Sequence, residues 1–362
     1  MLRNVCLIAD KGQDKKALLA FLQEPVKRAQ RGEQLYPFSN LGLAVELVRQ
    51  LNTAGYIVDV IEWSDKQIPR QKTYDLFVGH GSVNFTKLIQ ANTFGKILYF
   101  ATGSSANYHN AEANKRAKYF LQRHGVKYAA DRPVNIAEQK VYARADQVVC
   151  LGNEYVRHTF PDPKKVTALN ISVTKGQKIY APRLLRSKKH LLFFSGGGNL
   201  HKGLDLAIDA VIDTDIVLHV CTSIDPKFRR IFEREYGDKL KRNVVWHGFV
   251  SQRSLQFRNL IRRCQFAILL SCSEGSPGSL IDVMQYGLIP IVTPACGLDV
   301  QEVGFVIKNI DVDTLRKKLL EITARDTHGL RAKSKSVIQL VEREYSLEGF
   351  QKNLQRALGN IA

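Results

Sequence analysis

The chain has 362 residues, more than one hydrophobic core usually supports, so we expect two domains. Hydrophobic residues make up 44% and charged residues 24% of the chain, and no apolar run approaches the roughly 18 residues that cross a bilayer. The net charge of +19 favours anionic partners such as nucleotides, phosphorylated lipids or membrane surfaces, unless it reflects only a generally basic surface. Nucleic acid is not an expected partner, because no finger, RNP-like or basic heptad motif accompanies the charge.

The N-terminal sequence MLRNVCLIADKGQDKK predicts a short strand that ends in charged residues, not a secretory signal. The six cysteines are scattered, with no C-x-x-C pair, which is typical of buried thiols in a reducing compartment. We therefore expect a cytoplasmic protein with no disulfide framework and no metal site.

Short apolar runs alternate with helical patterns through the first half of the chain. Leu43, Leu47 and Leu51 recur at helical spacing, and residues 110–124 predict another helix with a strongly basic exposed face. The alternation predicts βαβ units and a parallel sheet. Strands are expected at 3–9, 56–63, 75–81, 96–102 and 147–152.

Residues 171–190 break this pattern with Gly176, Pro182 and many cations, and they are the predicted linker. The alternation then resumes as a second α/β domain. Strands are expected at 190–195, 215–221, 243–249, 265–270, 288–293 and 303–308, with helices at 204–212, 311–324, 331–344 and from Ser346 to about 358. In open parallel sheets ligands bind beyond the carboxyl ends of the strands, so the loops after the strands are the predicted site.

The first such loop is SGGGNLHKGLDL, residues 195–206. Its three glycines remove side chains where a ligand must approach the backbone, and Lys202 and Gly203 open a helix whose amides attract an anion. It is not a P-loop, because Leu204 follows Gly203, and it is not a dinucleotide fingerprint, because His201 stands at the third glycine position. The alternative is a surface turn with a solvated lysine.

The second loop is SEGSPGSLIDVMQYG, residues 273–287, between two apolar strands. Glu274 ends a strand, where its carboxylate can reach a ligand. Gly275 and Gly278 allow a tight turn, and Pro277 fixes φ near a helix start.

The helix that follows offers two further features. The amides of about Ser279 and Leu280 lie at its N-terminus, where phosphate oxygens bind, and Asp282 falls about a turn into it. This spacing predicts a sugar at Glu274, a ribose near Asp282 and a diphosphate between them. The alternative is that Glu274 and Asp282 are ordinary acids near a helix N-terminus.

These loops resemble those of the retaining glycosyltransferases of family 4, which have the GT-B fold. The family pattern E-G-x-P-x-x-x-x-E-A-x-x-x-G matches EGSPGSLIDVMQYG from Glu274 to Gly287, and KGLD at 202–205 and WHGFV at 246–250 match further family segments. The resemblance implies an α/β GT-B fold, with two Rossmann-like domains facing a central cleft. It implies an acceptor-binding domain at 1–180, a nucleotide-sugar-binding domain at 181–345 and a C-terminal helix at 346–362 that returns to the first domain.

The resemblance also implies roles for single residues. Glu274 contacts hydroxyls of the donor sugar, Asp282 takes the ribose, and Lys202 neutralises the departing diphosphate. The remaining donor-binding residues that it implies are Gly197, Gly198, Gly248, Phe249, Val250, Gly275, Ser276, Pro277, Gly278, Ser279 and Leu280. Two positions depart from the family: the second acid is Asp where the family has Glu, and Gly197 stands where the family often has an arginine.

One catalytic group is expected from the first half. His109 lies in ATGSSANYHN after the strand 96–102, near a loop where many relatives have a functional histidine, although a surface histidine before a helix is the alternative. His80, at the end of another strand, is a second candidate. Glu138 is a third, with a solvated helix acid as the favoured interpretation.

The resemblance thus implies a retaining, hexosyltransferase-type enzyme of polysaccharide biosynthesis. It would move a sugar, with retention, from a nucleotide-diphosphate donor to a glycan, lipid-linked or other acceptor. No metal or other cofactor is expected, because no DxD-like pair follows a strand.

The basic segments 27–33 and 115–124 have two possible interpretations: they bind anionic lipid, at the inner face of the cytoplasmic membrane, or they are solvated cationic faces. Two alternative functions also remain. The protein is an inactive GT-B protein that only binds a nucleotide sugar, or it is a nucleotide-sugar epimerase.

Overall fold

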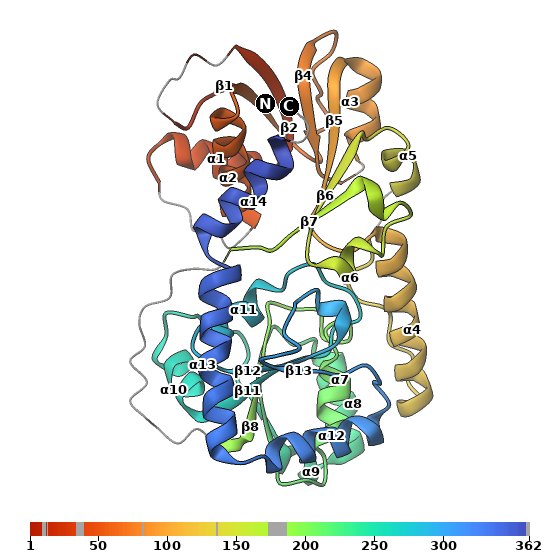
Figure 1. Ribbon diagram of the computed structural model, residues 1–362. Coiled ribbons are helices and arrows are strands. Elements are labelled where there is room, and N and C mark those ends of the chain that lie inside the picture. The colour runs from red at the N-terminus through yellow and green to blue at the C-terminus, as the bar shows by residue number, and fades with distance from the viewer. Residues whose placement is uncertain are drawn as a thin grey trace. The chain divides into compact units, whose positions relative to one another are not determined.

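The computed structural model describes residues 1–8, 12, 14–33, 40–81, 83–134, 137–172 and 187–359. The chain forms two compact units, drawn in Figure 1. Unit 1 consists of Met1–Tyr108, Val134–Thr174 and Glu344–Ala362, and unit 2 consists of His109–Pro133 and Lys175–Arg343.

Unit 1 is built on a seven-stranded sheet in the order β1-β3-β2-β4-β5-β6-β7, in which β1 is antiparallel to β3 and the other pairs are parallel. Its strands are β1 (Leu2–Val5), β2 (Lys15–Phe21), β3 (Tyr56–Glu62), β4 (Thr73–Gly79), β5 (Thr93–Ala101), β6 (Gln147–Leu151) and β7 (Val166–Leu169). Its helices are α1 (Gln23–Gln30), α2 (Asn40–Thr53), α3 (Phe85–Ala91), α5 (Glu138–Tyr142), α6 (Glu154–Arg157), the 3₁₀ turn η1 (Pro163–Lys165) and α14 (Leu347–Gly359). Helix α14 packs against α2 and β7, and Figure 1 shows it beside α2.

Two strands of unit 1 were not predicted, β2 and β7. The sequence of β2, KKALLAF, is rich in Ala and Leu, which favour helices, but β2 lies between β3 and β4 with its last five residues buried. Burial against both neighbouring strands overrides the local preference there.

Unit 2 is built on a six-stranded parallel sheet in the order β10-β9-β8-β11-β12-β13. Its strands are β8 (Ser187–Phe194), β9 (Val217–Cys221), β10 (Val244–Trp246), β11 (Cys264–Leu269), β12 (Ile289–Val292) and β13 (Phe305–Val306). Its helices and 3₁₀ turn are α7 (Leu204–Val211), α8 (Pro226–Tyr236), α9 (Asp238–Asn243), α10 (Leu255–Arg263), α11 (Gly278–Met284), η2 (Pro294–Cys296), α12 (Val312–Ala324) and α13 (Thr327–Glu344). The strand order reverses between β8 and β11, which is where ligands bind in doubly wound sheets. The predicted α/β fold with two Rossmann-like sheets is confirmed, and all strand pairs except β1 with β3 are parallel.

Residues 109–133, which the sequence assigns to the first domain, cluster with unit 2. The reason is the packing of α4 (Ala106–His124): Phe120 is fully buried and lies 6.1 Å, centroid to centroid, from Phe228 of α8. Arg123 also forms ion pairs with Asp205 and Asp209 of α7. The predicted domain boundary at 180 and most of the predicted linker 171–190 lie outside the described residues.

Candidate functional site

The loops that follow β8 and β11 form one structure at the point where the strand order reverses. The amide of Leu270 donates to the Lys202 carbonyl (3.1 Å), and the amide of Cys272 donates to the His201 carbonyl (2.9 Å). The hydroxyl of Ser271 donates to the same His201 carbonyl (3.2 Å). The two predicted loops therefore lie side by side.

Gly203 permits this close approach. A Cβ at this position would lie 2.4 Å from the carbonyl oxygen of Leu270, and its φ of +72° is a conformation that other residues rarely adopt. Gly203 also precedes α7, so it joins the glycine-rich loop to its helix.

Glu274 and Lys202 form the centre of this structure. The Lys202 ammonium lies 2.9 Å from Oε1 of Glu274, and their side chains are only 8% and 12% exposed. The imidazole Nε2 of His201 lies 3.5 Å from the same oxygen, and the hydroxyl oxygen of Ser271 lies 3.2 Å from it. The alternative of a solvated lysine on a surface turn is wrong.

The charges around Glu274 set its ionisation. Burial alone raises the pKa of the Glu274 carboxyl, but Lys202, His201 and Arg132 together lower that pKa well below its ordinary range. The Glu274 carboxylate is therefore held in its charged form.

Gly275, Ser276 and Pro277 lie between Glu274 and helix α11, which begins at Gly278. The first N–H groups of a helix have no partner within the helix. Here the amide of Leu280 already donates to the Pro277 carbonyl (2.9 Å), as the Ile281 amide does at 3.2 Å. The helix start therefore offers the amides of Gly278 and Ser279 to a ligand. The prediction included the amide of Leu280, but that amide already has a partner within the turn.

Asp282 is buried on α11, and its environment differs from that of Glu274. Its Oδ2 accepts a hydrogen bond of 2.6 Å from Nε2 of Gln252, whereas its Oδ1 is buried without a hydrogen-bond partner among the described residues. Burial raises the pKa of Asp282 to about 6, against a smaller lowering by Gln252. An unpaired buried oxygen of this kind fits a hydroxyl donor from a ligand. Gln252 was not predicted, because it lies in a loop without a motif.

Three of the predicted donor-binding residues, Gly248, Phe249 and Val250, follow β10. Gly248 and Phe249 line a cavity of about 780 Å³, together with Trp246 and with Arg229 of α8. The Phe249 side chain is 74% exposed, whereas Val250 is buried and is not among the lining residues.

A row of three histidines crosses the sheet next to this cavity. His190 Nδ1 lies 2.8 Å from His219 Nε2, and His219 Nδ1 lies 3.0 Å from His247 Nε2. The amide nitrogen of Gln256 lies 3.1 Å from His247 Nδ1. If Gln256 donates to His247, each ring donates from Nε2 to the next, so all three imidazoles are neutral. Burial lowers the pKa of His219 to about 4, helped by His190 and His247.

His109 lies within α4 and not before it. Its Nε2 is 2.7 Å from the carbonyl oxygen of Arg132, and its ring centroid lies 4.7 Å from that of His201. Burial lowers the pKa of His109, against the opposing hydrogen bond to Arg132. The predicted histidine thus belongs to the same cluster as Lys202 and Glu274.

Asp131 and Arg132 join this cluster, and neither was predicted. The Asp131 carboxylate accepts hydrogen bonds from the amides of Leu200 (3.1 Å) and His201 (2.7 Å). Arg132 lies 3.7 Å from Oε1 of Glu274. Both residues fall in a stretch without periodicity, and adjacent charges before a proline are a weak signal.

The other two candidates lie in unit 1. His80 Nδ1 lies 3.0 Å from the Phe100 carbonyl oxygen, and burial lowers the pKa of its imidazole. Glu138 is only 3% exposed and accepts a hydrogen bond from the Tyr142 hydroxyl at 3.0 Å, so the interpretation as a solvated helix acid is wrong. Burial raises the pKa of Glu138.

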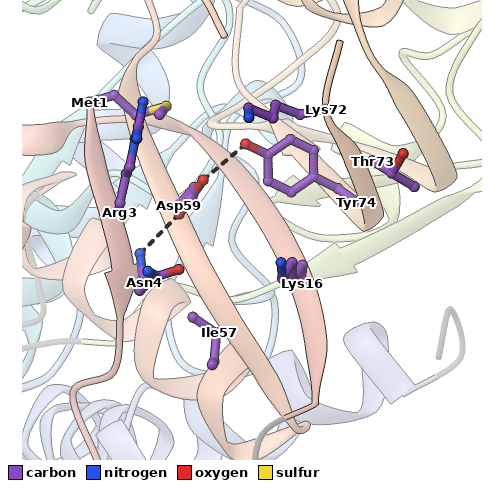
Figure 2. A pocket seen from close by; sticks show the side chains of 9 residues that line it. All are labelled: Met1, Arg3, Asn4, Lys16, Ile57, Asp59, Lys72, Thr73 and Tyr74. Atoms are coloured by element: carbon purple, nitrogen blue, oxygen red, sulfur yellow. Dashed lines mark hydrogen bonds between the residues drawn. The ribbon is translucent and has the colours of Figure 1, made fainter. Parts of the chain in front are cut away.

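Unit 1 also contains a smaller cavity of about 250 Å³, shown in Figure 2. Lys16 and Lys72 line it, and Asp59 accepts hydrogen bonds of 2.9 Å from the Asn4 amide and from the Tyr74 hydroxyl. Lys16 lies near the start of β2 and Lys72 directly precedes β4, so this cavity lies at the amino ends of these strands.

The described helices are each too short or too polar to span a membrane. Among all the residues that the structure describes, no cluster of three or more His, Cys, Asp or Glu side chains is placed to hold a metal ion.

Comparisons with known proteins concern the family and the fold of the chain. Residues 177–336 match the family model "Glycosyl transferases group 1", which covers the glycine-rich loop, Glu274 and Asp282. No curated protein sequence matches the chain. The match supports the predicted resemblance over residues 177–336, which is less than half of the chain.

Solved structures share the fold at low identity. Sucrose-phosphate synthase from Thermosynechococcus elongatus is 15% identical with a TM-score of 0.63, over 96% of this chain and 98% of the other. WaaG, a glycosyltransferase involved in lipopolysaccharide biosynthesis, is 14% identical with a TM-score of 0.56, over 96% of this chain and 99% of the other. A TarM variant from S. aureus, in complex with fondaparinux, alpha-GlcNAc-glycerol and UDP, is 16% identical with a TM-score of 0.53. That alignment covers 79% of this chain, which spans only about half (55%) of the TarM chain. These likenesses confirm the GT-B fold.

Proposed function

We propose that this chain, whose residues 177–336 match the family model of group 1 glycosyl transferases, transfers a sugar from a nucleotide-diphosphate donor to a glycan or lipid-linked acceptor, with retention of the anomeric configuration. The observation that carries the proposal is the buried pair of Lys202 and Glu274, which are 2.9 Å apart where the strand order reverses. UDP in the TarM complex supports a nucleotide diphosphate as the leaving group.

In the proposed reaction the bond between the sugar C1 and the diphosphate oxygen breaks. Negative charge develops on the diphosphate, and the ammonium of Lys202 and the amides of Gly278 and Ser279 stabilise it. Groups that are fixed before the reaction do this without reorganisation. The acceptor oxygen forms the new bond to C1 on the same face, and its proton passes to the departing phosphate oxygen.

Glu274 holds the donor sugar in this reaction. Its carboxylate stays charged because of its cationic neighbours, so it accepts hydrogen bonds from sugar hydroxyls as C1 gains positive charge. Asp282 takes the ribose through its unpaired Oδ1, and Gly248 and Phe249 border the base.

The charge on the diphosphate is stabilised by protein cations and amides in this mechanism, so we propose that no metal ion is required. Turnover measured after removal of divalent ions with EDTA should be unchanged. A loss of turnover that added Mg²⁺ or Mn²⁺ restores would contradict this part of the proposal.

A lipid-linked acceptor would place the protein at a cytoplasmic membrane surface. WaaG, which acts in lipopolysaccharide biosynthesis, supports such an acceptor. Two cations of the segment 115–124 fit neither of the two alternatives, lipid contact or a solvated face, because Arg116 is buried and Arg123 pairs with Asp205 and Asp209. The net charge and the exposed Lys27 support the weaker proposal of peripheral attachment, which sedimentation with phosphatidylglycerol vesicles tests.

The test of the main proposal is a panel of UDP, GDP, ADP and CMP and their sugars, measured by thermal shift and by release of free nucleotide. We expect one base series to bind and one donor to be hydrolysed or transferred. Glu274→Gln should keep nucleotide binding and lose turnover by at least roughly 100-fold, the effect of removing one transition-state contact.

The exposed Glu342 provides the control, because Glu342→Gln removes a carboxylate from α13 outside the candidate site. Full turnover in Glu274→Gln would refute the role of Glu274. Nucleotide-sugar binding without any turnover in the unaltered protein would favour the inactive alternative, and a product that stays a free nucleotide sugar would favour an epimerase.

A further inference from the structure

The proposed function leaves an excess of negative charge at the diphosphate. Lys202 already pairs with Glu274 at 2.9 Å, so its charge is largely compensated before a donor binds. Gly197, where the family often has an arginine, carries no side chain to add a second cation. A diphosphate next to Glu274 therefore needs a positive group from elsewhere.

Arg132 is the cation that the fold brings to this point. Its guanidinium lies 3.7 Å from Oε1 of Glu274, a long contact, and its side chain is 52% exposed. A guanidinium has five N–H donors, so most of them remain available to a phosphate. Two of these donors can form parallel hydrogen bonds to two phosphate oxygens in the plane of the guanidinium.

The backbone around Arg132 is fixed against the glycine-rich loop. Asp131 accepts the amides of Leu200 and His201, and the Arg132 carbonyl accepts a hydrogen bond of 2.7 Å from His109 Nε2. Arg132 itself has a φ of +60°, which a non-glycine residue adopts only when its surroundings hold it there.

Gly198 shows that the loop accommodates this side chain. A Cβ at Gly198 would lie 2.8 Å from Cδ of Arg132, so the stem of the arginine passes directly over the glycine-rich loop. The absence of a side chain at Gly198 thus makes room for Arg132 as well as for a ligand.

We propose that Arg132 is a second diphosphate-binding cation of the site, delivered by the segment after α4 in place of a side chain at position 197. His109 and Asp131 then act as positioning residues, because they hold the backbone of Arg132 and do not themselves contact the phosphates. The proposal rests on the proposed function, since it assigns a ligand contact within the same donor site.

The test separates the phosphate contact from the rest of the nucleotide. Affinities of the unaltered protein, Arg132→Gln and Arg132→Lys are measured by calorimetry for UDP, GDP and ADP and for the corresponding nucleosides. We expect Arg132→Gln to weaken binding of the recognised nucleoside diphosphate by about 10- to 100-fold, the range of a charged hydrogen bond. Nucleoside affinity should change less than about twofold, and Arg132→Lys should recover part of the loss because it keeps the charge.

Arg242→Gln is the matched control, because Arg242 is exposed on α9 and precedes β10, at the amino ends of the strands. It should bind the diphosphate as the unaltered protein does. Unchanged diphosphate affinity in Arg132→Gln would overturn the inference, and so would an equal loss for diphosphate and nucleoside, which would indicate a disturbed loop. If the unaltered protein binds none of the nucleotides, the proposed function fails first.

Discussion

The ammonium of Lys202 and the carboxylate of Glu274 lie 2.9 Å apart, although 72 positions separate them in the chain. The pair joins the loop after β8 to the loop after β11. Because both side chains are nearly inaccessible, each would be costly to leave charged without the other.

Replacing Lys202 with Met should therefore affect both stability and binding. We expect a loss of roughly 3 kcal/mol in the free energy of unfolding, because Glu274 stays buried with weaker cationic support. Nucleoside diphosphate affinity should fall at least about tenfold. Chemical denaturation and calorimetry measure the two effects.

The double variant Lys202→Met/Glu274→Gln provides the control for this pair. It removes both charges of this pair, so it should regain most of the stability without regaining diphosphate affinity. If the two single losses of stability simply added, the pair would not be coupled as the structure indicates.

Asp282→Asn should stabilise the protein at neutral pH. The pKa of Asp282 is raised to about 6 from an ordinary value of 3.8, so the folded state binds more protons than the unfolded state between these values. Stability from this group is thus present below about pH 4 and is lost as pH rises through 6. The variant should gain about 2 kcal/mol at pH 7 and almost nothing at pH 4.

The same variant should bind the recognised nucleotide more weakly, because the proposed ribose acceptor is lost. The loss should disappear when the ligand is the corresponding 2′,3′-dideoxynucleotide. Asp238→Asn, on the exposed surface of α9, should show neither the gain in stability nor the change in binding. Equal effects on both ligands would remove Asp282 from the ribose site.

The three-histidine row should make stability fall in mild acid. The pKa of His219 is lowered to about 4 from 6.5, so the unfolded state binds more protons between these values, and stability is lost as pH falls through that window. We expect His219→Gln to reduce the loss between pH 7 and pH 4.5 by about 2 kcal/mol.

Urea denaturation at a series of pH values measures this difference. Nitrogen-15 NMR of the unaltered protein reports the ring protonation directly, and all three imidazoles should carry their proton on Nε2 at pH 7. A charged imidazole at His219 at that pH would contradict the hydrogen-bond order from Gln256 to His190.

Gly203→Ala should be strongly destabilising, because the added Cβ meets the Leu270 carbonyl at 2.4 Å in addition to the unfavourable φ of +72°. Gly125 separates the two causes: its φ is +63°, but a Cβ there meets nothing within 4 Å. Gly125→Ala should therefore cost about 1–2 kcal/mol from its backbone alone. Gly203→Ala should cost a further 1–3 kcal/mol of steric strain. Equal midpoints in thermal denaturation would show that the contact with Leu270 relaxes freely.

The sequence predicted the second unit well because its signals are local. The buried part of each strand of unit 2 lies in a short apolar run, and the loops after β8 and β11 contain glycines and charged residues close together. A parallel sheet brings such loops to one edge, so the meeting of Lys202 and Glu274 follows from topology.

The residues that the sequence did not predict depend on contacts between distant segments. Asp131 and Arg132 gain their position from the amides of Leu200 and His201, some seventy residues later. The sequence of α4 alone predicts that its basic residues are solvated. Arg116 and Arg123 instead pair with Asp205 of α7, which lies more than eighty positions later in the chain. No pattern within one helix shows such partners.

The inclusion of residues 109–133 in unit 2 has a consequence for protein engineering. Unit 2 is not a continuous stretch of the sequence, so a fragment that starts at the family match, residue 177, would lack Phe120 and Arg123. The carboxylates of Asp205 and Asp209 would then lose their ion pairs with Arg123, and the face of α8 that contacts Phe120 through Phe228 would become exposed. Chimaeras that exchange donor specificity between transferases should therefore include residues 109–133, with most of α4, together with the C-terminal half.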